Sequence, residues 1–258
     1  MKITILGCGA STGVPVIGCD CLVCQSDNPK NKRRRVSVYV QTAHENILID
    51  TSPDLRMQAL DNNIRQVDAV LYTHDHGDHT HGIDELRRFN YLAQDFVPIY
   101  GDAHTLELLT TRFAYAFRPP IPEYGWTRTA LRPHAIIAGE AFRVGETQVL
   151  PFRQEHGVVD SVGYRIGDFA YSTDVKTLPD DAFKALEGVK LWVVDCQGYE
   201  PFYTHAHLEL TLSWIAKVKP QLAVLTHMGH GLDYETLKRE LPDGIVPAYD
   251  NMVVDNIA

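Results

Sequence analysis

Residues 73–79 read Thr73-His74-Asp75-His76-Gly77-Asp78-His79 and directly follow the apolar run Ala69-Val70-Leu71-Tyr72. A short apolar run bounded by polar residues is typical of a buried strand, so the motif stands at a strand end. Packing does not explain so many imidazoles and carboxylates in a short segment, because these groups are costly to bury without partners. Together they are typical ligands of zinc, manganese or iron. The motif therefore predicts a metal site, with His74 and His76 facing one ion and Asp78 and His79 facing a second.

Further metal-binding residue types follow other predicted strands. His156, Asp174 and His227 each come shortly after an apolar, strand-like segment. Rigid scaffolds commonly mount functional groups at strand ends. Taken singly, each residue is more typical of a turn or loop. Together with the first motif, they predict the ligands that one loop cannot supply.

Composition excludes several classes of protein. The chain has 258 residues, with 24 basic and 33 acidic side chains and a net charge of −9. This charge argues against a nucleic-acid partner that is bound through its phosphate backbone. The sequence contains no apolar run of transmembrane length, and the apolar start at Ile3 is too short for a signal peptide. We therefore expect no membrane partner and a cytoplasmic location.

Apolar, β-branched segments alternate with helical patterns along the chain, which predicts a layered α+β fold. No linker is polar enough to mark a boundary, so we expect a single domain over residues 1–258. Helical spacing predicts helices over 54–62, 80–93, 180–187, 207–218 and 233–240. Strands are predicted over 3–6, 36–40, 47–49, 69–72, 98–100, 142–144, 148–152, 163–166, 169–172, 191–194 and 222–226.

A cysteine loop at residues 18–25 forms the second signal. Cys19, Cys21 and Cys24 follow the pattern C-x-C-x-x-C, which can hold one structural zinc and leave one position for a distant ligand. His230, three residues after His227, is the best candidate for that fourth ligand. Free or redox-active thiols remain the alternative interpretation.

The complete pattern resembles the metallo-β-lactamase superfamily. This resemblance implies a four-layer αββα sandwich with a dinuclear metal site over the whole chain. It also implies that Asp50 supports the site without ligating a metal, as carboxylates behind metal ligands do. The implied ligands are His74, His76 and His156 for one metal, Asp78, His79 and His227 for the other, and Asp174 as the bridge.

The cysteine loop is similar to that of the PhnP-type phosphoribosyl cyclic phosphate phosphodiesterases. It is also similar to a loop in a protein of pyrroloquinoline quinone biosynthesis. The first likeness implies hydrolysis of a small phosphorylated substrate, either phosphoribosyl 1,2-cyclic phosphate or a cyclic nucleotide, by a hydroxide shared between two zinc or manganese ions. Asp78 and Asp174 would hold these ions, and His207 would be the general acid. A plain surface role for His207 remains open.

Other functions of the same fold stay open at this point. They include a 3′-tRNA-processing endonuclease, a thioesterase and a non-catalytic carrier protein of cofactor biosynthesis. The acidic net charge argues against the first, and the complete ligand set argues against the last. The sequence does not identify the metals, the exact substrate or the oligomeric state, for which a homodimer is one expectation.

Two weaker features flank the first predicted strand. The glycine-rich segment 6–13 predicts a tight turn near the site. The basic run 32–35 is most typical of a solvated face and, as a functional alternative, of a patch that steers anions to the entrance. Any second phosphate of the substrate would be held by arginines, with these candidates unranked: Arg34, Arg35, Arg87 and Arg88.

Overall fold

The alternation of side chains along the early strands determines which residues face each core. In β2 (Ser37–Gln41), Val38 and Val40 are buried on one face and Tyr39 on the other. β3 (Asn46–Ile49) repeats this pattern. Successive side chains of a strand point to opposite faces of its sheet, so these strands contribute to two different cores. A sheet that is apolar on both faces must be covered on both sides.

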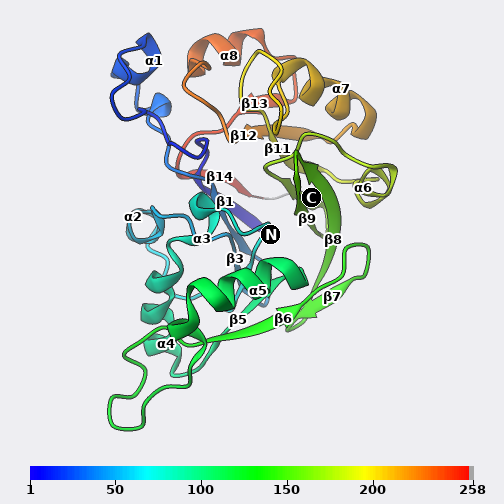
Figure 1. The fold of residues 1–258 in the computed structure, drawn as a ribbon. Coiled ribbons are helices and arrows are strands. Elements are labelled where there is room, and N and C mark those ends of the chain that lie inside the picture. The colour runs from blue at the N-terminus through cyan, green and yellow to red at the C-terminus, as the bar shows by residue number, and fades with distance from the viewer. Residues whose placement is uncertain (256–258) are drawn as a thin grey trace.

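The computed structural model describes residues 1–255, which form two seven-stranded sheets (Figure 1). The strand order is β14-β1-β2-β3-β4-β5-β6 in the first sheet and β13-β12-β11-β10-β9-β8-β7 in the second. Both sheets are mixed, with parallel pairing from β3 to β6 and from β10 to β13. The remaining bounds are β1 (Lys2–Gly7), β4 (Ala69–Leu71), β5 (Val97–Gly101), β6 (Leu131–Ala135), β7 (Phe142–Val144), β8 (Thr147–His156), β9 (Val159–Ile166), β10 (Phe169–Ser172), β11 (Leu191–Asp195), β12 (Leu222–Thr226), β13 (Ile245–Pro247) and β14 (Met252–Asp255).

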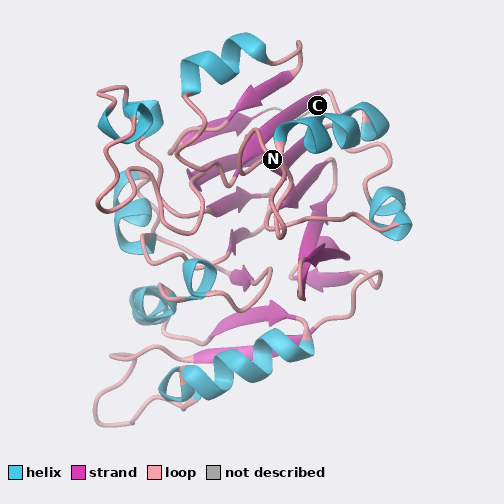
Figure 2. Cartoon of the chain, turned by 45° about the horizontal axis from the view of Figure 1, so that its top comes forward, coloured by secondary structure: helices cyan, strands magenta, loops and turns pink. Residues whose placement is uncertain are grey.

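Helices cover the outer faces of both sheets (Figure 2). One apolar core fills the space between the sheets and extends under α6 and α7, and a second core separates the first sheet from α2, α4 and α5. The order helix, sheet, sheet, helix confirms the predicted α+β fold with a four-layer αββα sandwich. The helices are α1 (Leu22–Gln25), α2 (Leu55–Asp61), α3 (Gly77–Thr80), α4 (Arg87–Ala93), α5 (Ala103–Arg112), α6 (Asp180–Ala185), α7 (Leu208–Val218) and α8 (Tyr234–Glu240), with 3₁₀ turns η1 (Pro29–Asn31), η2 (Ile83–Leu86) and η3 (Ala114–Phe117).

The predicted helix over residues 80–93 is interrupted in the structure. The chain forms α3, η2 and α4 in this region instead of one helix. Gly82 explains the interruption, because a Cβ there would lie 2.0 Å from the carbonyl oxygen of Ser52. The N–H of Gly82 also donates to the carbonyl of Thr51. This close backbone approach isolates α3 as a single turn that carries two of the predicted ligands.

Several elements have no counterpart in the sequence prediction. They include α1, α5, the edge strand β6 and the short strands β13 and β14. β6 contains Pro133, which argues against a strand except at a sheet edge, where β6 lies. The predicted domain extends to residue 258, and its last three residues lie outside the described residues. Within residues 1–255, each helix is too short or too polar to cross a membrane.

Candidate active site

The seven predicted metal ligands meet where strands of both sheets end. They form two groups, and within each group the donor atoms lie within 4.8 Å of one another. Asp174 belongs to both groups. The first group adds His74, His76 and His156 to Asp174, and the second adds Asp78, His79 and His227. The structure thus brings the residues together in the grouping that the family resemblance implies.

Asp174 lies between the two groups and faces imidazoles of each. Its Oδ2 is 3.1 Å from Nε2 of His79, and its Oδ1 is 3.4 Å from Nε2 of His227. On the other side, the same Oδ1 is 3.6 Å from Nε2 of His156 and 3.9 Å from Nε2 of His74. A carboxylate in this position can bridge two metal ions.

Left-handed backbone conformations turn the chain at three of the strand ends. Asp50, Asp174 and His227 have φ angles of 61°, 52° and 56°. Such residues cost free energy in this conformation and are concentrated at functional sites, where the surrounding structure holds them in place. The strand ends therefore supply strained but fixed positions for three polar groups of the site.

Asp50 supports the site through hydrogen bonds, as predicted. Its Oδ1 accepts the backbone N–H of Thr73 at 2.8 Å, and its Oδ2 accepts the hydroxyl of Thr73 at 2.8 Å. Nδ1 of His79 lies 2.8 Å from the same Oδ2. Because Nδ1 is held in this way, Nε2 of His79 faces Asp174 and Asp78. Asp50 is fully buried, so this orientation is rigid.

A second supporting carboxylate, Asp195, stands at the end of β11. Its Oδ1 is 3.6 Å from Nδ1 of His227, and its Oδ2 is 3.1 Å from Nδ1 of His205. Asp195 is fully buried, and its Oδ2 also accepts the backbone N–H of Val175. We interpret this group as an orienting carboxylate behind His205, whereas its Oδ1 and Nδ1 of His227 are too far apart for a hydrogen bond. Asp195 is not among the site residues that the sequence predicts.

The electrostatics of the cluster separate neutral from charged imidazoles. Burial and the neighbouring His79 hold the pKa of His74 well below its usual range, so this ring is neutral. Burial disfavours a charge on His227, but Asp174, Asp78 and Asp195 raise its pKa to about 9. Burial also works against ionisation of Asp174, yet His227 and His79 hold its pKa well below the usual range. The site thus carries fixed carboxylate charge that is balanced by protons on imidazoles.

The missing hydrogen bonds of three buried imidazole nitrogens indicate whether metal ions fit these residues. Nε2 of His74, His79 and His227 is buried and has no hydrogen-bond partner. A buried polar atom without a partner is destabilising unless another group satisfies it. Imidazole nitrogens grouped around a carboxylate are the donor set of zinc, manganese or iron. The residues therefore fit two divalent cations, one at each group.

His205, rather than His207, lies against this cluster. The ring of His205 stacks on that of His227 with centroids 4.6 Å apart and lies 4.7 Å from the ring of His156. His207 is the N-cap residue of α7, and its backbone forms a bridge with Gly198. Within residues 1–255, His207 takes part in none of the ring contacts or ion pairs of the cluster. Only Ala206 separates the two histidines, so sequence spacing does not distinguish them.

Arg112 of α5 holds the motif loop from outside. Its guanidinium lies 2.6 Å from Oδ2 of Asp75 and donates to the Asp75 carbonyl at 2.7 Å. The two residues are 37 positions apart in the sequence, so no local motif predicts this contact. Among the arginines considered for a substrate phosphate, Arg34, Arg35 and Arg87 are paired with Asp61, Asp54 and Asp84.

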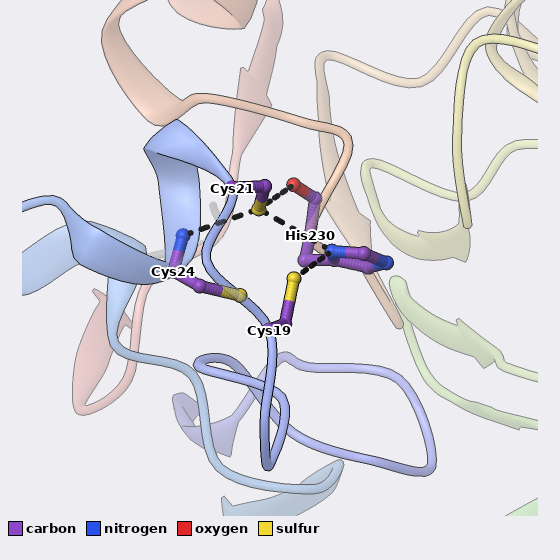
Figure 3. Close-up of side chains that lie close together, drawn as sticks. All are labelled: Cys19, Cys21, Cys24 and His230. Atoms are coloured by element: carbon purple, nitrogen blue, oxygen red, sulfur yellow. Dashed lines mark hydrogen bonds between the residues drawn. The ribbon is translucent and has the colours of Figure 1, made fainter.

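The cysteine loop and the segment after β12 form a separate donor cluster (Figure 3). The donor atoms of Cys19, Cys21, Cys24 and His230 lie within 4.8 Å of one another. The sulfurs of Cys19 and Cys21 are each 3.4 Å from Nδ1 of His230. Ligands at about 2.3 Å from a tetrahedral zinc have this mutual spacing. The geometry therefore brings His230 to the position expected of the fourth ligand.

The thiols of this cluster are free and chemically unequal. All of them are reduced cysteines in the structure. The backbone N–H of Cys24 and the ring of His230 lower the pKa of Cys21 to about 6. Burial instead raises the pKa of Cys24. A thiolate is the form that ligates zinc, so Cys21 is the residue best prepared for metal binding.

Known proteins of the same architecture include hydrolases and metal-binding proteins. A crystal structure of a diphosphatase from the PhnP family is 35% identical, with a TM-score of 0.90, over 99% of this chain and 97% of that chain. Zn²⁺-bound PqqB from Methylobacterium extorquens has a TM-score of 0.79 over 99% of this chain and 100% of that chain. Its identity is 19%, so it shows the fold alone. The first likeness agrees with the resemblance inferred from the motifs, and the second agrees with the fold that this resemblance implies.

A similar sequence belongs to a longer protein. An octanoyltransferase of Porphyromonas gingivalis is 34% identical over 256 residues, which are 98% of this chain and 51% of that protein. The chain thus spans about half the length of this relative.

The family model described as a β-lactamase superfamily domain matches residues 45–228. This range begins just before β3, which Asp50 follows, and ends just after His227, so it contains both groups of candidate ligands. It covers well over half of the chain. The chain therefore belongs to the metallo-β-lactamase superfamily.

Proposed function

We propose that this protein is a metal-dependent hydrolase of a small phosphoric diester. The observation that carries this proposal is Asp174, shared by two imidazole groups, with His205 stacked beside them. Two divalent cations bound there would activate water and neutralise charge on the phosphoryl oxygens. All seven ligand positions hold metal-binding side chains, which favours catalysis over a carrier role.

The chain's own residues fix the geometry that this reaction needs. A hydrogen bond to Asp50 orients His79, and the Nε2 atoms of His79 and His227 both face the shared carboxylate. Most of the ligands are buried, whereas His76 is exposed and Asp78 is partly buried. A preorganised polar site of this kind stabilises developing charge without rearranging during the reaction.

His205 is our candidate for the general acid. Asp195 accepts from its Nδ1, so Nε2 is the ring nitrogen left to donate a proton. The proton goes to the oxygen that leaves phosphorus, and the P–O bond to that oxygen breaks. Such assistance is worth about 10²–10⁴-fold when the leaving group is a basic alkoxide. His207 forms none of these contacts, but its Nδ1 is buried without a hydrogen-bond partner, so it stays the alternative candidate for the acid.

A cyclic diester, either phosphoribosyl 1,2-cyclic phosphate or a cyclic nucleotide, is the substrate class that we favour. Its alkoxide leaving group needs the acid that His205 can supply. A second candidate is a diphosphate, because the diphosphatase of the PhnP family is similar over nearly the whole of both chains. Phosphate is a better leaving group than an alkoxide, so hydrolysis of a diphosphate should depend less on His205.

Two other substrate classes fit less well. The net charge of −9 disfavours a tRNA precursor, whose binding depends on contacts with many phosphates. A thioester is chemically possible at a dinuclear centre, and the octanoyltransferase similarity concerns a protein twice as long. A thioester does not explain why a histidine with an orienting carboxylate stands beside the ligands, because a thiolate is less basic than an alkoxide and needs less help from an acid.

The test compares initial rates of the Zn²⁺- or Mn²⁺-loaded protein on five substrates. These are a ribose cyclic phosphate, bis(p-nitrophenyl) phosphate, a nucleoside diphosphate, an acyl thioester and a tRNA precursor. We expect the cyclic phosphate to be hydrolysed with the highest kcat/KM. A preference for the diphosphate would select the second candidate, and hydrolysis of the thioester alone would refute phosphoric ester chemistry.

A further inference from the structure

Arg33 is a buried cation outside the candidate active site. It belongs to the basic run 32–35, which the sequence predicts as a solvated face, yet its exposed fraction is only 2%. That prediction is wrong for this residue. Burial lowers the pKa of the guanidinium, and within residues 1–255 it forms no ion pair with a carboxylate. A buried charge is costly unless hydrogen bonds satisfy it.

The partners of Arg33 are main-chain carbonyls of one loop. Nη1 donates to the carbonyl of Gly229 at 2.9 Å, and Nη2 donates to the carbonyl of Leu232 at 2.6 Å. Nη2 also donates to Oδ1 of Asn31 at 3.1 Å. The planar fork of arginine can hold two carbonyls at once, which a lysine ammonium cannot match. Arg33 therefore fixes the shape of the loop after β12.

Asn31 extends this support below the same loop. It is fully buried, and its Oδ1 accepts the backbone N–H of Tyr234 at 2.9 Å. Its Nδ2 donates to Oδ2 of Asp233 at 2.7 Å. Arg33 thus holds residues 229–232, and Asn31 holds residues 233–234, which follow directly.

The loop held by Arg33 carries ligands of both candidate metal clusters. His227 begins it and faces Asp174, and His230 faces the sulfurs of Cys19 and Cys21. The N–H of Met228 donates to the carbonyl of Cys8, so the first strand's turn also fixes the loop. Only two residues separate the two histidines, so a shift of this loop moves both.

We propose that Arg33 is a positioning residue for both metal sites, because its guanidinium holds the 227–232 loop in the one shape that presents His227 and His230 to their separate clusters. This inference rests on the metal sites of the proposed function. It also explains why a charged group is buried in this place. If Arg33 served stability alone, its replacement would lower the free energy of unfolding but would not lower the metal affinity of both sites.

Zn²⁺ affinity, measured by competition with a chelator, tests the proposal. A Cys21→Ser background reports the catalytic site, and an Asp174→Ala background reports the cysteine site. In each background, Arg33→Lys should lower the Zn²⁺ affinity by about tenfold or more, as loss of a group that orients metal ligands does. Leu109→Ala is the control, because Leu109 is fully buried in the other core and its replacement lowers stability without touching the loop.

Each result decides the question. Reduced affinity at both sites in Arg33→Lys, with the control unchanged, supports the proposal. A change at one site only, or at neither, overturns it. If Arg33→Lys does not fold, Asn31→Ala decides instead, with a smaller loss at both sites expected and unchanged affinities contradicting the proposal. Absence of bound Zn²⁺ in the unaltered protein would refute the metal sites themselves, and with them the role of Arg33.

Discussion

The two candidate metal clusters share one loop but differ in their surroundings. The catalytic cluster collects ligands from the ends of both sheets, most of these side chains are buried, and Asp50 orients one of them, His79. The cysteine cluster lies on a loop and a one-turn helix, with His230 exposed. The fold positions the ligands of the catalytic cluster, whereas a metal bound at the cysteine cluster would hold the cysteine loop in place.

This difference in support implies a difference in role. Sheet ends provide positions that do not depend on the metal, which is what a reaction centre requires. A loop that contributes three thiols has little apolar core of its own, so metal binding there contributes directly to folding free energy. We therefore expect chemistry to depend on the first cluster and stability on the second.

The largest expected effect comes from removing a catalytic ligand. Asp78→Ala should lose one of the two metals at the catalytic cluster and lower kcat/KM by about a thousandfold or more, because each ion is worth several kcal/mol of transition-state stabilisation. Elemental analysis and initial rates measure both effects. The fold should survive, which circular dichroism checks. Two fully retained catalytic metals in this variant would contradict the ligand assignment.

The second effect distinguishes the two histidines that precede α7. His205→Ala should slow hydrolysis of an alkyl or ribose cyclic diester by about 10²-fold or more and should barely affect p-nitrophenyl esters, whose leaving group departs as a stable anion. His207→Ala is the matched control and should leave the ratio of the two rates unchanged. Metal content should stay at the wild-type level in both variants.

The opposite result would support the sequence-based prediction that His207 is the general acid. If His207→Ala changed the ratio of rates and His205→Ala did not, the acid would be His207. Equal losses on both substrates in His205→Ala would instead mean that this ring positions the substrate or holds a metal.

The fold and most of the ligand set were predictable because their signals are local. The dense motif 73–79 and the strand-end residues His156, Asp174 and His227 each stand beside an apolar run, and the sheets bring those runs together. The strand over 222–226 has the predicted bounds. The local sequence is sufficient to predict a site residue when that residue ends a strand or follows it closely.

The unpredicted features depend on contacts between distant segments. Asp195 ends an ordinary apolar strand, and only the packing of β11 beside β10 and β12 brings it to two imidazoles. Arg33 sits in a basic run that looks solvated, and its burial follows from a loop almost two hundred residues away. The choice between His205 and His207 depends on where α7 begins, which sequence periodicity defines only approximately.

A smaller effect is expected from the cysteine cluster. Cys21→Ser should lower Tm by roughly 4–8 °C, which corresponds to about 2 kcal/mol in a chain of this length, while activity per folded molecule changes little, because a closed metal site adds to folding free energy. Thermal unfolding with total zinc measured on the same sample tests this expectation. Unchanged Tm together with unchanged zinc would show that the three thiols hold no structural metal.

The smallest effect should come from the periphery of the catalytic cluster, where Arg112 pairs with Asp75. The side chain of Arg112 is 42% exposed, so water and salt weaken the pair, and its loss should cost about 1 kcal/mol or less. Arg112→Ala should therefore leave kcat within about fivefold of the wild-type value and should retain both metals. Chemical unfolding gives the stability, kinetics give kcat and elemental analysis gives the metal content, all measured on one preparation. A large loss of metal in this variant would show that the motif loop is not fixed by its buried contacts alone, and the contrast between a rigid catalytic cluster and a metal-dependent cysteine loop would then have to be withdrawn.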